Sequence, residues 1–96
     1  MRYKIVLAPE AIEDLDELKA NVRAQVVDGI DTHLRHEPTK VSKSRIKRLR
    51  GISRPQYRLR IDDIRVFYDV VAANVEVLAI VDKIQAEKWL ARHGEK

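Results

Sequence analysis

The order of patterned segments predicts an α+β fold in which helices pack on a mostly antiparallel, four-stranded sheet. Two apolar lines at helical spacing lie near the N-terminus, and three strand-like segments follow in the second half of the chain. The chain has 96 residues, enough for one hydrophobic core and too few for two. We therefore expect residues 1–96 to form one domain with the order strand, helix, helix, three strands, helix.

The N-terminal third predicts a strand followed by a helical hairpin. Residues 2–7 are rich in Tyr, Ile and Val, and Pro9 stands where a helix can begin, because its missing N–H costs nothing there. Acidic residues follow in the first turns, where the helix dipole favours them. After a short break, a second apolar line runs at four-residue spacing from Val22 to Leu34 and ends before Pro38.

The second half predicts three strands and a short C-terminal helix. Segments rich in β-branched and aromatic residues are separated by turns and cover residues 56–61, 64–71 and 75–81. Residues 85–92 carry apolar side chains at helical spacing. Residues 37–47 have little periodicity and are expected to form a loop, with a short strand at 46–49 left open.

Positive charge is concentrated in the middle of the chain. The formal net charge is +4, yet residues 40–65 alone hold ten Lys and Arg against two Asp. The segments on either side are slightly acidic, so the whole excess belongs to this stretch. Such a concentration is typical of a surface that binds a polyanion, although a solvated basic surface is the ordinary alternative.

Composition argues against several kinds of site. The chain has no cysteine, which excludes disulfides and thiolate chemistry, and its three histidines do not cluster with carboxylates in a ligand pattern. We therefore expect neither a metal nor another cofactor. The apolar stretch near the N-terminus is too short for a signal peptide or a membrane span, so a cytoplasmic protein without a membrane partner is expected.

A two-residue hairpin turn at Asp62-Asp63 would place three arginines on one face of the sheet. In that register Arg60 lies opposite Arg65, with Arg58 beside them. Two opposed arginines destabilise a hairpin by about 0.2–1 kcal/mol, which favours a role in holding an anion. Phosphate matches guanidinium geometry best. The competing interpretation is ion pairing with nearby aspartates, such as Asp82 beside Arg65.

Such a face suits the cleavage of RNA by its own 2′-hydroxyl. The enzyme then positions the backbone, stabilises charge on the phosphorane and assists two proton transfers. Guanidinium groups serve the charge but are poor bases, because they stay protonated. No obvious acid or base is evident, since Tyr57 and Tyr68 are expected to point into the core and the histidines to lie on the surface.

Over nearly its whole length the chain resembles toxins of the RelE/ParE superfamily. The resemblance rests on the order and spacing of several motifs, at residues 3–9 with Ala11 and Asp14-Leu15, then 47–51, 57–61, 64–70 and 77–81. It implies a toxin of a type II toxin–antitoxin system that forms a hetero-oligomer with an acidic, RelB-like antitoxin. In RelE-like members it further implies ribosome-dependent cleavage of messenger RNA, with the ribosome and the message as partners.

The same resemblance implies roles for individual residues. Arg65 takes the place of the family's phosphate-stabilising arginine, and Arg58 and Arg60 those of two basic residues that are often lysines. Lys83 falls where the family often has an arginine after the last strand. Trp89 falls where some members carry a catalytic tyrosine. Tryptophan cannot act as an acid or base, so we expect it to stack on an RNA base or to dock its helix on the sheet.

Two further surfaces are expected. Contacts to RNA outside the catalytic centre would come from Lys43, Arg45, Lys47, Arg48, Arg50 and Arg54. On the sheet face beside the arginines, an apolar set that the C-terminal helix only partly covers would bind the antitoxin: Phe67, Leu78 and Ile80. The antitoxin's acidic groups would then neutralise the arginines.

Two other functions fit the same sequence. A ParE-like toxin would inhibit DNA gyrase without cutting nucleic acid. A non-catalytic basic module would bind RNA or DNA and would not arrest growth.

Overall fold

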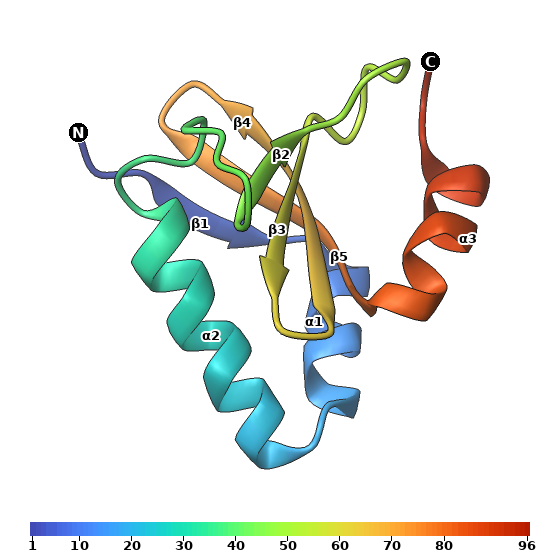
Figure 1. The fold of residues 1–96 in the computed structure, drawn as a ribbon. Helices are drawn as coiled ribbons and strands as arrows, with labels where there is room; N and C mark the ends of the chain where they lie inside the picture. Colours follow the sequence, from blue (N-terminus) through green and yellow to red (C-terminus); the bar gives the residue numbers. More distant parts are fainter.

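The structure, a computed structural model that describes residues 1–96, places three helices around a five-stranded sheet (Figure 1). In chain order the elements are β1 (Lys4–Leu7), α1 (Pro9–Glu17), α2 (Ala20–Leu34), β2 (Ile46–Arg48), β3 (Tyr57–Ile61), β4 (Ile64–Val71), β5 (Asn74–Asp82) and α3 (Lys83–His93). The hairpin of α1 and α2 packs on one face of the sheet, and α3 packs on the other. The predicted α+β class and the order of the helices are confirmed.

The sheet has the strand order β1-β5-β4-β3-β2. β1 runs parallel to β5, and all other neighbours are antiparallel. The expected count of four strands is corrected to five, because Ile46–Arg48 pairs with β3 at the edge of the sheet. This strand has only three residues, two of them exposed and basic, so it carries almost no apolar pattern.

The hairpin of β3 and β4 has the predicted register. Its two-residue turn is Asp62-Asp63, and Asp62 has a φ of 49°, a left-handed conformation that Asp tolerates better than most residues. Arg60 pairs with Arg65, and Arg58 pairs with Phe67. The three arginines therefore share one face of the sheet, as expected.

A β-bulge in β5 changes which side chains face each layer. Phe67 pairs with Ala79, but the residue after Phe67 pairs with Val77, so Leu78 is an additional residue in β5. The alternation shifts by one at this point. As a result Val77 and Ile80 both join the core beneath α1 and α2, while Ala79 faces α3.

Each face of the sheet carries its own hydrophobic core. The core beneath the helical hairpin joins thirteen buried residues, and Leu59 and Tyr68 are among those with no exposed surface. Burial of one such side chain contributes about 1.5–3 kcal/mol to folding. The smaller core beneath α3 has three buried members, which are Phe67, Ala79 and Ala86.

The prediction that Phe67, Leu78 and Ile80 form one exposed apolar surface is wrong. Phe67 is fully buried, because the ring of Trp89 stacks on it with the ring centroids 4.9 Å apart. Ile80 lies in the core on the opposite face, and only Leu78 is partly exposed. Strict alternation along β5 would place Leu78 and Ile80 together, and the bulge removes that relation.

Gly29 allows α2 to approach β3 closely. A Cβ at this position would lie 2.6 Å from Cδ1 of Ile61. Glycine inside a helix lowers the stability of the helix by about 1 kcal/mol relative to alanine. Here the close packing of α2 on the sheet explains why glycine stands at this position.

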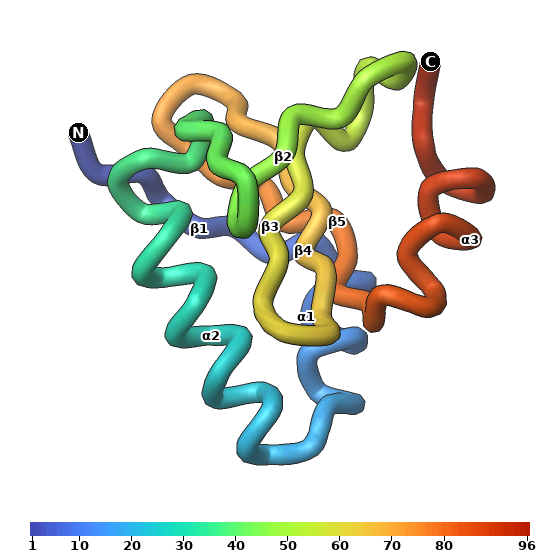
Figure 2. The backbone as a smooth tube through the Cα atoms, in the orientation of Figure 1, coloured from blue at the N-terminus to red at the C-terminus, as the bar shows by residue number.

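The loop between β2 and β3 is joined to the C-terminal tail. The Ser53 N–H donates to the Glu95 carbonyl at 2.6 Å, and Arg54 and Glu95 form an isolated bridge. Figure 2 shows this loop reaching the C-terminal end of the chain. The contact holds the end of α3 near the sheet. None of the three helices has the length and apolar character needed to cross a bilayer.

Candidate functional site

A basic cleft opens beside β2, β3 and β4, with a volume of about 390 Å³. Two serines and Ile46 form part of its lining, and the other lining residues are all basic: Lys43, Arg45, Lys47, Arg58, Arg60 and Arg65. No acidic residue lines it. We call this site the arginine cleft.

The register of the sheet builds the floor of the arginine cleft. Lys47 on β2 pairs with Arg58 on β3, and Arg60 on β3 pairs with Arg65 on β4. Paired residues share a face, and so do alternate residues along one strand, so all four point away from the main core. α3 packs on β4 and β5 on this face and leaves the side formed by β2 and β3 open (Figure 1).

A turn before β2 supplies the remaining basic side chains. The Ser42 hydroxyl oxygen accepts the backbone N–H groups of Arg45 and Ile46, at 3.0 and 3.3 Å. This closes the turn that brings Lys43 and Arg45 to the rim of the cleft. The serines of this turn were not predicted from the sequence. Ser42, four residues before the start of β2, is the signal that could have indicated the turn.

No ion pair neutralises the arginine cleft. The four ion pairs of the structure involve basic residues that do not line it, which are Arg35, Lys40, Arg54 and Lys83. Asp82, expected beside Arg65, caps α3 instead and accepts the N–H of Gln85 at 2.8 Å. The register pairs Arg65 with Val81. The interpretation that nearby aspartates form ion pairs with the cleft arginines is therefore wrong.

Arg65 is held by the turn that precedes its strand. Its Nη1 donates to the carbonyl oxygens of Asp62 at 2.7 Å and Ile64 at 3.1 Å. Burial of the guanidinium lowers the pKa of Arg65 from the usual value for arginine, and the charges of Arg58 and Arg60 lower it further. Since arginine stays protonated in proteins, this shift marks a confined positive charge that a bound anion would relieve.

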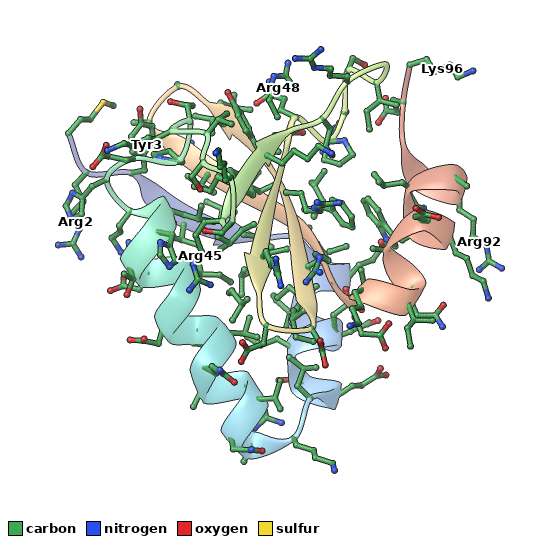
Figure 3. The ribbon with its side chains drawn as sticks, in the orientation of Figure 1. Arg2, Tyr3, Arg45, Arg48, Arg92 and Lys96 are labelled. Carbon is green, nitrogen blue, oxygen red and sulfur yellow. The ribbon has the colours of Figure 1, made fainter.

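Three of the other basic residues expected to contact RNA lie outside the cleft. Arg48 packs over the ring of Tyr57, with Cζ 5.2 Å from the centroid. Arg54 pairs with the buried Asp69 at 3.0 Å, so its charge is already compensated. Arg50 is exposed in the loop that follows β2. Figure 3 shows Arg48 at the opposite end of the short strand β2 from Arg45.

Lys83 and Trp89 also lie outside the arginine cleft. Lys83 pairs with Asp63 at 3.4 Å, beside the turn of the β3–β4 hairpin. The ring of Trp89 lies nearly parallel to that of Phe67, at 8°, and contacts His93 on its own helix. The expectation that Trp89 docks its helix on the sheet is confirmed.

The lining of the cleft defines what it can bind. Apart from the two serine hydroxyls, its side chains offer only hydrogen-bond donors, and six of them carry positive charge. The residues present contain no group of three or more His, Asp or Glu side chains placed to hold a metal ion. Such a lining accepts an anion and can stabilise the extra negative charge that develops during displacement at phosphorus.

A small α+β domain with an anion-accepting cleft is the class of protein that these features define. The model of one family, the ParE toxin of type II toxin-antitoxin system, parDE, matches residues 5–86. The chain therefore belongs to the ParE toxin family, within the RelE/ParE superfamily of type II toxins. No curated protein matches the chain in sequence.

Solved structures of RelE toxins have the same fold. The toxin–antitoxin complex RelBE2 of Mycobacterium tuberculosis is similar at 24% identity, over 85% of this chain and 99% of that chain, with a TM-score of 0.72. The archaeal RelE–RelB complex of Pyrococcus horikoshii is similar at 23% identity, over 86% and 97%, with a TM-score of 0.70. A mutant of E. coli RelE in the free state has 19% identity over 97% and 99%, with a TM-score of 0.58.

Proposed function

We propose that this toxin is a ribosome-dependent endoribonuclease whose arginine cleft holds the scissile phosphate of a messenger RNA. One observation carries the proposal, namely that six basic side chains surround the cleft and none of them forms an ion pair. A phosphodiester supplies the missing negative charge and accepts the bidentate hydrogen bonds that guanidinium groups favour. The resemblance to RelE-like toxins supports RNA on the ribosome as the substrate.

In the proposed reaction the 2′-hydroxyl gives its proton to solvent water and its oxygen attacks the adjacent phosphorus. The new 2′-O–P bond forms as the P–O5′ bond breaks, which leaves a 2′,3′-cyclic phosphate and a free 5′-hydroxyl. Negative charge grows on the two non-bridging oxygens in the transition state, and Arg58, Arg60 and Arg65 stabilise it. Removal of one such donor commonly costs about 10²–10³-fold in rate.

The departing 5′-oxygen needs a proton, and the cleft offers two ammonium groups to give it. Lys47 lies directly opposite Arg58, and Lys43 lies on the rim. Guanidinium groups do not release protons in this way, whereas lysine is a known acid and base in enzymes. We assign the role of proton donor to Lys47, because it pairs with Arg58 across β2 and β3 and so lies on the same face of the sheet.

The test is cleavage by the purified chain of a messenger bound to programmed ribosomes, with products mapped by primer extension. We expect wild type and Arg2→Ala to cut the message and Arg65→Ala to lose cutting by about 10²-fold or more. Arg2 is a matched control, because it is exposed at the margin far from the cleft (Figure 3). Equal cutting by wild type and Arg65→Ala would overturn the proposal, as would no cutting at all.

A second candidate is inhibition of DNA gyrase, which the ParE description of the matching family favours. In that case the chain binds a protein target and leaves messages intact. Supercoiling by purified gyrase distinguishes the two. Loss of supercoiling in the presence of the chain, together with uncut messages, would select this candidate over the nuclease.

We also propose that an antitoxin binds the groove beside β1. The groove has a volume of about 600 Å³, and its apolar lining residues are Ile5, Leu7, Leu15, Ala20, Ala24, Val27 and Ile30. β1 is an edge strand, so its outer side has no strand partner, and an extended segment can pair there. Two of the similar solved structures are complexes of the RelB–RelE type, which supports a partner of this kind.

A further inference from the structure

A second hollow adjoins the arginine cleft at the edge of the sheet. It has a volume of about 230 Å³ and lies between the end of α2, the loop that follows it and the start of β2. Its lining includes the imidazoles of His33 and His36 and the charged groups of Lys40 and Arg45, together with one acidic residue, Glu37. We call it the histidine hollow. None of the residues expected from the sequence to contact RNA, except Arg45, lies in it.

The histidine hollow and the arginine cleft adjoin each other. They share Ser42, Arg45 and Ile46 in their linings. Arg45 stands at the boundary, where its Nη1 donates to the Arg60 carbonyl at 3.2 Å. Figure 3 shows Arg45 beside α2, at the margin of the sheet. A chain that leaves the cleft past Arg45 therefore enters the histidine hollow.

The donors of the histidine hollow are available to a ligand. Lys40 has one partner, Glu37, at 3.4 Å, and both side chains are largely exposed, at 73% and 65%. Exposed pairs of this kind are weak, so a phosphate can replace the carboxylate. His36 is exposed and His33 half-buried, and neither forms a side-chain hydrogen bond. The dipole of α2 opposes an anion here, because Thr32 and His33 lie in its last turn, but at an exposed site this weakens binding only about 1.7- to 5-fold.

We propose that the histidine hollow is a second subsite for single-stranded RNA, which holds a backbone phosphate next to the one bound in the arginine cleft. The strand crosses the edge of the sheet at Arg45, and His36 and Lys40 hold the flanking phosphate. This inference rests on the proposed RNA substrate. It adds a direction to the path of the strand, from the cleft toward the C-terminal end of α2.

The test compares binding of short and long RNA by wild type and by His36→Gln with Lys40→Gln. The probes are 2′-O-methyl oligouridylates of about 4 and about 12 nucleotides, which cannot be cut because the nucleophile is blocked. The control carries Lys4→Gln and Lys19→Gln, two exposed lysines on β1 and before α2. Because this control loses more fixed charge than the test variant, it accounts for non-specific electrostatics.

We expect the test variant to bind the long probe about 2- to 25-fold more weakly than wild type and the short probe equally well, since two exposed charge contacts are lost and each contributes about 1.5- to 5-fold. For the long probe, the slope of the logarithm of the binding constant against the logarithm of the salt concentration should become shallower by about 0.7 if one phosphate contact is lost. Unchanged binding of the long probe, or equal weakening of both probes, would overturn the subsite. If wild type binds neither probe, the proposed RNA substrate fails as well.

Discussion

Arg65 carries an electrostatic cost that the nearby charge of Asp63 offsets only in part. Its guanidinium is half-buried, faces Arg60 across the hairpin and lies near Arg58, which together lower its pKa. Two backbone carbonyls fix the side chain, so the charge cannot swing away into solvent. A group kept in such a position at a cost to folding is well suited to stabilise charge that appears only during a reaction.

Lys47→Arg tests the proton donor separately from the bound phosphate. Arginine keeps the positive charge opposite Arg58 but does not release its proton, so we expect RNA binding to change little and cleavage to fall by about 10²-fold or more. Binding of a 2′-O-methyl RNA and single-turnover cleavage would be measured on the same preparations. Cleavage at the wild-type rate would remove Lys47 from the mechanism.

Tyr68→Phe tests a polar contact inside the main core. The Tyr68 hydroxyl donates to the Pro38 carbonyl at 2.6 Å, and the side chain is fully buried, which also raises its pKa. Removal of the hydroxyl leaves a buried carbonyl unpaired, so we expect the free energy of unfolding to fall by about 1–3 kcal/mol in urea denaturation. Tyr57→Phe is the matched control, and equal effects of the two changes would contradict this account.

At the scale of elements, the hairpin and the last strand could be predicted, but the bulge in the last strand could not. The two-residue turn Asp62-Asp63 leaves only one register for β3 and β4, so the arginine face followed from the sequence. The bulge at Leu78 depends on packing of β5 against two layers, and no residue pattern indicates it. The contribution of Lys47 to the cleft was equally hidden, because β2 is too short to show alternation.

Asp14 joins α1 to β5 beyond the end of β1, and its carboxylate accepts the Ile80 N–H at 2.9 Å. Burial raises the pKa of Asp14, so the folded protein holds this proton more tightly than the unfolded chain does. The contribution of Asp14 to stability therefore falls as pH rises through its folded pKa. Asp14→Asn cannot ionise. We expect the stability of the variant relative to wild type to increase between about pH 4 and about pH 7, measured by urea denaturation. A constant difference would contradict the shift.

Val27→Glu tests the groove proposed for the antitoxin. Val27 lies on α2, is 50% exposed and lines the groove, so a carboxylate there should leave folding intact and oppose an acidic partner. We expect weaker capture by the co-encoded antitoxin, measured by calorimetry, with no loss of RNA cleavage. Val41→Glu is the matched control, because it is similarly exposed but lies outside the groove. If Val27→Glu and wild type bound the antitoxin with equal affinity, the antitoxin would bind at another surface.

For the whole molecule, the fold separates two surfaces that the sequence suggested were one. The basic cleft lies at the β2–β3 side of the sheet, whereas the apolar groove lies beside β1, at the opposite edge of the strand order. The concentration of charge in residues 40–65 predicted the first surface, because those residues form the loop and strands that surround it. The second combines β1 with the helical hairpin, a relation that only the folded chain shows.

The most direct test of the proposed nuclease is induction of the chain in cells, with growth recorded and messenger RNA 5′ ends mapped. Wild type would be compared with Arg65→Ala and with the control Arg2→Ala. We expect growth arrest and new 5′ ends inside translated reading frames for wild type and Arg2→Ala, and neither for Arg65→Ala. Arrest by wild type with intact messages would contradict it and would favour inhibition of gyrase.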